Sequence, residues 1–104
     1  MIISFKNDII KGDCENFDSC EKSYGNELAM RIFQRVSEFV TAENLSEILM
    51  IPAIQIEKVY EDPFTYQINL IKNSKLLIKL SHEIQLPDKK SDFISEVEIV
   101  KILV

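Results

Sequence analysis

Hydrophobic residues follow two different periods along this chain of 104 residues. Up to Phe39 and Val40 they recur every three or four positions, which is typical of amphipathic helices. From Ile54 to the last residue they alternate with polar residues, which is typical of half-buried strands. The pattern therefore predicts a helical first half followed by a sheet.

The first half contains signals for one strand and two helices. A short apolar run over residues 2–5 predicts a strand, and Asn7 or Asp8 then offers an N-cap for a helix that reaches Tyr24. Gly25 ends that helix, and a second helix with one strong apolar stripe follows to Val40. Residues 41–46 suit one more short helical turn before Pro52.

The second half alternates over residues 54–57, 66–70, 76–80 and 94–104, which predicts four strands. Residues 72–74 form a short connection in which Asn73 suits a positive φ, so the strands on either side should pair antiparallel. Residues 81–92 include Pro87 and the charged run 88–90 and should be an exposed loop. The expected fold is α+β: two antiparallel helices on one face of a small, mostly antiparallel sheet.

Length and composition limit the possibilities further. With 104 residues and 46% hydrophobic residues, the chain suits one domain, residues 1–104, with one core. It has no apolar stretch long enough for a membrane span and no signal peptide pattern, so we expect a cytoplasmic protein without membrane contact. Cys14 and Cys20 would point to different faces of a helix, and we expect reduced thiols near the core, with no metal site and no cofactor.

Charge is unevenly distributed. The net charge is −5, so the protein as a whole should be repelled by phosphate. Residues 1–62 hold six basic and twelve acidic side chains, whereas residues 63–104 hold six and five. The acidic character therefore belongs to the helical half, and nucleic acid is not the obvious partner.

Four segments carry a resemblance to a known family: residues 3–6 (ISFK), 24–29 (YGNELA), 41–45 (TAENL) and 96–100 (EVEIV). In order and spacing they resemble the landmarks of RelE/HigB-like bacterial toxins, in particular the plasmid maintenance killer proteins. The resemblance implies a toxin of a type II toxin–antitoxin module, silenced by an antitoxin protein. Active members of that family cleave messenger RNA on the ribosome.

The catalytic pattern of the family is not matched. RNA cleavage needs a base, an acid and cations for the pentavalent phosphate. Here Lys58 is the one cation in a stretch that is usually rich in lysine, and Leu76 stands where the family has an arginine. The chain also ends before the tail that often carries tyrosine and histidine. The usual RNA-cutting site is therefore not visible in the sequence.

The remaining candidates are few. Lys75 and Lys79 lie on one side of a predicted strand and, with Lys58, form the best candidate RNA-binding patch, although solvated lysines on an outer sheet face are the more common case. His82 is the single histidine and the candidate for proton transfer. Tyr60 and Tyr66 could stack on a base, but packing is the simpler role.

Of two further features of the helical half, one has a plain structural explanation and the other suggests a partner. Arg31 and Arg35 are spaced to pair with Glu27 and Glu38 on a solvated face. The apolar run 48–51 exceeds what a core needs and suggests a docking strip for another chain.

Two functions follow from these observations. The first is a toxin-like protein that binds an antitoxin, with the ribosome and mRNA as targets if it cuts RNA. The second is a non-catalytic interaction or regulatory module derived from the same fold, which the negative charge favours.

Overall fold

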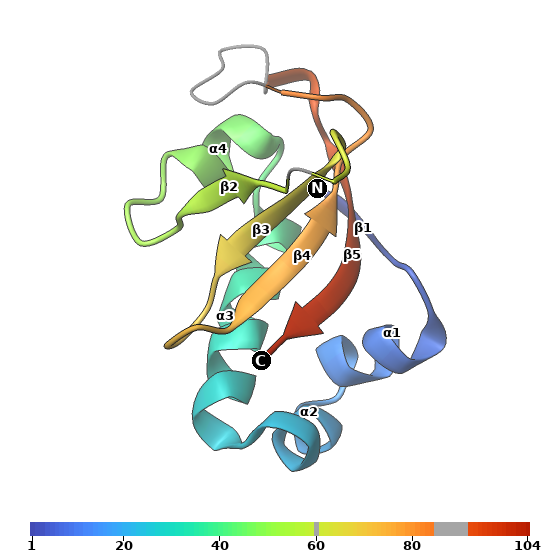
Figure 1. Ribbon diagram of the computed structural model, residues 1–104, viewed down its shortest axis with the longest axis vertical. Coiled ribbons are helices and arrows are strands. Elements are labelled where there is room, and N and C mark those ends of the chain that lie inside the picture. The colour runs from blue at the N-terminus through green and yellow to red at the C-terminus, as the bar shows by residue number, and fades with distance from the viewer. Residues whose placement is uncertain (60, 85–91) are drawn as a thin grey trace.

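A computed structural model describes residues 1–59, 61–84 and 92–104, and confirms an α+β fold (Figure 1). The predictions for Tyr60 and for residues 85–91 lie outside the described residues. The helices are α1 (Asp8–Glu15), α2 (Phe17–Tyr24), α3 (Asn26–Thr41) and α4 (Leu45–Leu49). The strands are β1 (Ile2–Phe5), β2 (Ile56–Lys58), β3 (Thr65–Asn69), β4 (Lys75–Lys79) and β5 (Glu96–Leu103).

The five strands form one mixed sheet in the order β1-β5-β4-β3-β2. β1 runs parallel to β5, and the other neighbours are antiparallel. The first and last strands of the sequence are therefore adjacent, with the helices forming the crossover between β1 and the rest of the sheet. The sequence predicts a mostly antiparallel sheet, and it does not predict this parallel pair.

The sheet has one buried face and one open face. α3 and α4 lie behind the sheet in Figure 1, and no helix among the described residues crosses the face toward the viewer. The buried face of β3 and β4 carries Tyr66, Ile68, Leu76 and Ile78, which are all fully buried. α3 covers them with a stripe that includes Ile32 and Phe39. The alternation in the sequence therefore divides a core face from a solvated face.

The prediction of one continuous helix up to Tyr24 is wrong. The described residues contain two short helices there, α1 and α2. Asn16 has an extended backbone with φ −121°, and it ends α1. Its side-chain oxygen accepts a hydrogen bond of 3.1 Å from the Ser19 amide, so it is also the N-cap of α2. Asparagine favours such a cap over a helix interior, which explains the break.

Two smaller expectations also need correction. In the β3–β4 connection the positive φ, 54°, belongs to Lys72 and not to Asn73. In the apolar run 48–51, Ile48 is completely buried in the core, while Met50 is 80% exposed. No helix among the described residues is long and apolar enough to cross a membrane.

Candidate functional site

The open face of the sheet carries two of the predicted lysines. Lys75 and Lys79 lie on β4 and pair with Asn69 and Thr65 of β3, so both side chains project to the face without helices. They are four positions apart in the strand, a distance of about 13 Å. The structure therefore places these two lysines on the same face, at opposite ends of one strand.

Lys79 is surrounded by acidic groups. Its partner on β5 is Glu98, and Asp62 lies near it in the turn before β3. The pKa of Asp62 is lowered by a hydrogen bond from the Phe64 amide at 2.9 Å, by the Thr65 hydroxyl and by the charge of Lys79. The Lys79 ammonium is thus flanked by two carboxylates, which weakens its attraction for a phosphate.

Lys58 is not brought together with the other two lysines. On β2 it pairs with Tyr66, which pairs with Ile78 on β4, and cross-strand partners project to the same face. Lys58 therefore lies on the helix-bearing side, at the edge of the sheet. There it forms an ion pair with Glu83, which raises the pKa of Lys58.

His82 is exposed in the segment that follows β4. Its Nδ1 lies 3.0 Å from Oγ of the preceding residue, Ser81. No hydrogen bond or ion pair in the described part of the chain joins the imidazole to a carboxylate or a lysine. His82 thus has no orienting acid of the kind that positions a general base.

Tyr66 has a structural role in the described residues. It is completely buried, and its hydroxyl donates a hydrogen bond of 2.9 Å to the Ile84 carbonyl. The Ile84 amide donates back to the same hydroxyl at 2.8 Å. Tyr66 therefore fixes the segment after β4 against the core, and is not available to stack on a base.

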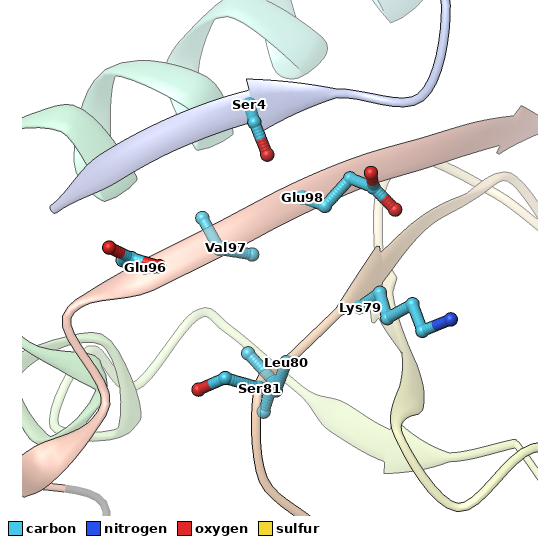
Figure 2. A pocket seen from close by; sticks show the side chains of 7 residues that line it. All are labelled: Ser4, Lys79, Leu80, Ser81, Glu96, Val97 and Glu98. Atoms are coloured by element: carbon cyan, nitrogen blue, oxygen red, sulfur yellow. The ribbon is translucent and has the colours of Figure 1, made fainter.

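A groove of about 300 Å³ crosses the open face where β4 ends and β5 begins (Figure 2). β1 contributes Ser4, β5 contributes Glu96 and Glu98, and β4 contributes Lys79, with Ser81 in the segment that follows it. Figure 2 shows Lys79 and Glu98 extending in the same general direction from neighbouring strands. The groove combines hydroxyls, two carboxylates and one ammonium, so it has no excess of positive charge for RNA.

The two thiols lie away from this groove, in the contact between α1 and α2. Cys14 and Cys20 are both buried and free, as the sequence predicts. Burial raises the pKa of Cys14 to about 12 and that of Cys20 to about 11, and the neighbouring Asp13 adds to both shifts. Protonated, buried thiols of this kind are poor nucleophiles.

Arg35 is the residue that the sequence pattern misplaces. It is completely buried, where a solvated helix face was expected. Its Nη1 lies 2.7 Å from Glu38 Oε1, and its Nη2 donates to the Ala53 carbonyl at 3.3 Å. Nε has no hydrogen-bond partner among the described residues. This charge is buried between α3 and the segment that leads to β2, away from the open face.

Within the described residues, no group of three His, Cys, Asp or Glu side chains is placed to hold a metal ion. Comparisons with models of protein families, with curated proteins and with solved structures found no match to this chain.

Proposed function

We propose that this protein is the toxin-like component of a type II toxin–antitoxin module, and that it acts in the cytoplasm by binding an antitoxin protein. Two features support this proposal. The sequence landmarks resemble those of RelE/HigB-like toxins, and the element order is a strand, then helices, then consecutive antiparallel strands. In this proposal the chain keeps the framework for partner binding, and RNA cleavage is not its main activity.

The positions of the lysines support the second part of the proposal, that RNA cleavage is not the main activity. A pentavalent phosphate requires positive groups that converge on one point, and a base and an acid on either side. Lys58 faces away from Lys75 and Lys79, and Lys79 lies between Asp62 and Glu98. These positions favour a non-catalytic interaction module over a nuclease.

A ribosome-dependent mRNA endoribonuclease is the second candidate. One observation favours it: Lys75 and Lys79 share the open face with the groove, and His82 follows that strand by three residues. In that case the two lysines would contact phosphates and His82 would transfer a proton. The ribosome and mRNA would then be partners in addition to the antitoxin.

Induced expression in a bacterial culture separates the two candidates. We expect no new cleavage sites when a reporter mRNA is mapped by primer extension after induction. A Lys75→Ala/Lys79→Ala variant should affect growth in the same way as the wild type. Cleavage that disappears in this variant and in His82→Ala would support the nuclease instead.

Antitoxin binding is tested directly by co-expression with the product of any small gene that neighbours the gene for this chain. We expect a stable complex that survives raised salt, because an apolar protein contact is screened far less than a phosphate contact. Separate elution of the two proteins on size-exclusion chromatography at low and high salt would contradict the proposal.

A further inference from the structure

The two outer strands of the sheet leave backbone groups that no other described strand satisfies. In β1 the Ile2 amide donates to the Ser95 carbonyl at 2.9 Å, and the Lys6 amide donates to the Ile99 carbonyl at 3.0 Å. The residues between them alternate in direction, so the N–H and C=O groups of Ile3 and Phe5 point away from the sheet. Among the described residues, no strand therefore pairs with the outer edge of β1.

The opposite edge is protected by charge. β2 has three residues, and two of them are Glu57 and Lys58. Lys58 is held there in its ion pair with Glu83. Short, charged edge strands are the usual protection against pairing with another chain. β1 differs, because its four residues, Ile-Ile-Ser-Phe, carry no charge.

Three exposed apolar side chains belong to segments that meet near the N-terminal end of β1. Ile2 is 64% exposed, Val40 at the end of α3 is 58% exposed, and Phe93 is 84% exposed. Backbone contacts link these segments to the start of β1. The Met1 nitrogen lies 3.3 Å from the Val40 carbonyl. The Ile2 amide donates a hydrogen bond to the carbonyl of Ser95, which is two residues after Phe93. Apolar groups beside an unpaired, uncharged strand are typical of a surface that another strand covers.

We propose that β1 pairs antiparallel with β1 of a second copy of this chain, with the two-fold axis at Ser4. The free groups determine this register. Ile3 lies opposite Phe5 of the partner subunit, and each of the two such pairs can exchange two backbone hydrogen bonds. Ser4 then meets its own copy at the axis. The two sheets become one continuous sheet of ten strands, from five strands in each copy.

The side chains of β1 suit this register. Ile3 and Phe5 are half-buried and point to the core side. In the dimer, Ile3 of one copy would therefore face Phe5 of the partner subunit in an apolar pair. On the open face, exposed Ile2 lies opposite exposed Lys6 of the partner subunit. No like charges face each other between residues 2 and 6, which is the condition that a self-pairing strand must meet. The inference does not depend on antitoxin binding or on RNA.

Sedimentation velocity of the purified full chain tests the proposal, over concentrations from about 1 µM to about 500 µM. We expect reversible dimers in this range. Ile2→Lys places a lysine opposite Lys6 twice in each dimer and should raise the dissociation constant about tenfold or more. Ile2→Glu instead creates two opposite-charge pairs and should retain the dimer.

The double variant Ile2→Lys/Lys6→Glu should restore the dimer that Ile2→Lys loses. Ile9→Lys is the matched control, because Ile9 is 77% exposed on α1 and should have no effect. A wild-type protein that stays monomeric throughout the range would overturn the proposal. Equal loss of dimer in Ile2→Lys and Ile2→Glu would overturn the register, and with it the pairing of β1 with β1. Circular dichroism of each variant checks that the fold is retained.

Discussion

Removal of the carboxylate that balances Arg35 should be the most damaging single charge change in this protein. Arg35 is completely buried on α3, and its one carboxylate partner in the described residues, Glu38, has a side chain that is 21% exposed. Glu38→Ala would leave a guanidinium in the core with the Ala53 carbonyl as its remaining hydrogen-bond acceptor. A charge that loses its partner inside a protein keeps its full desolvation cost.

The size of the effect follows from this geometry. Breaking a buried ion pair by removing one partner costs about 3–5 kcal/mol. Water reaches part of the Glu38 site, so we expect a loss near the lower limit, about 3 kcal/mol. Arg35→Met behaves differently, since it removes the buried charge together with the unpaired Nε–H and leaves a carboxylate that water can solvate. Its cost should be below about 1.5 kcal/mol.

Urea denaturation at pH 7, followed by far-UV circular dichroism, measures both changes. Glu83→Ala is the control, because it removes the partner of Lys58 at the surface and should leave the free energy of unfolding nearly unchanged. Equal losses in Glu38→Ala and Glu83→Ala would show that the Arg35 charge is not buried in solution. A loss in Arg35→Met as large as that in Glu38→Ala would refute the expected difference between removing the buried charge and removing its partner.

Three further predictions concern stability. Tyr66→Phe leaves the buried amide and carbonyl of Ile84 without their hydroxyl partner and should lower the free energy of unfolding, measured by urea denaturation, by about 2–3 kcal/mol. Tyr24→Phe, at a half-buried site, should lower it less. Asn16→Ala removes the α2 cap and should lower the free energy of unfolding by about 1 kcal/mol. Asn16→Asp keeps a capping oxygen and should retain most of that stability. Folding raises the pKa of Cys14 from 9.0 to about 12 and that of Cys20 from 9.0 to about 11, so the thiols of the unfolded chain ionise first as the pH rises. The free energy of unfolding should therefore fall between pH 9 and 11. The fall should be less steep in the variant Cys14→Ala/Cys20→Ala.

The candidate site could be predicted only in part. Alternation places Lys75 and Lys79 on the same face of one strand, and the structure agrees. The position of Lys58 depends on how β2 pairs with β3, and a shift by one residue would have moved it to the other face. The sequence does indicate that Glu98 dilutes this patch, but it does not place Asp62 beside Lys79, because the turn before β3 and the end of β4 meet only in the folded sheet.

By itself, the sequence determined the local elements whose signals lie within a few residues. The strand over residues 2–5, the helix that follows Gly25 and the β3–β4 hairpin all come from short-range periodicity, caps and turns. The tertiary structure decided everything that depends on distant partners: the parallel pairing of β1 with β5, the burial of Arg35, and the irregularity that lets both Ile99 and Ile102 face the core. The physical reason is that a strand pairing or a buried charge is stabilised by groups far away in the chain, which no local pattern records.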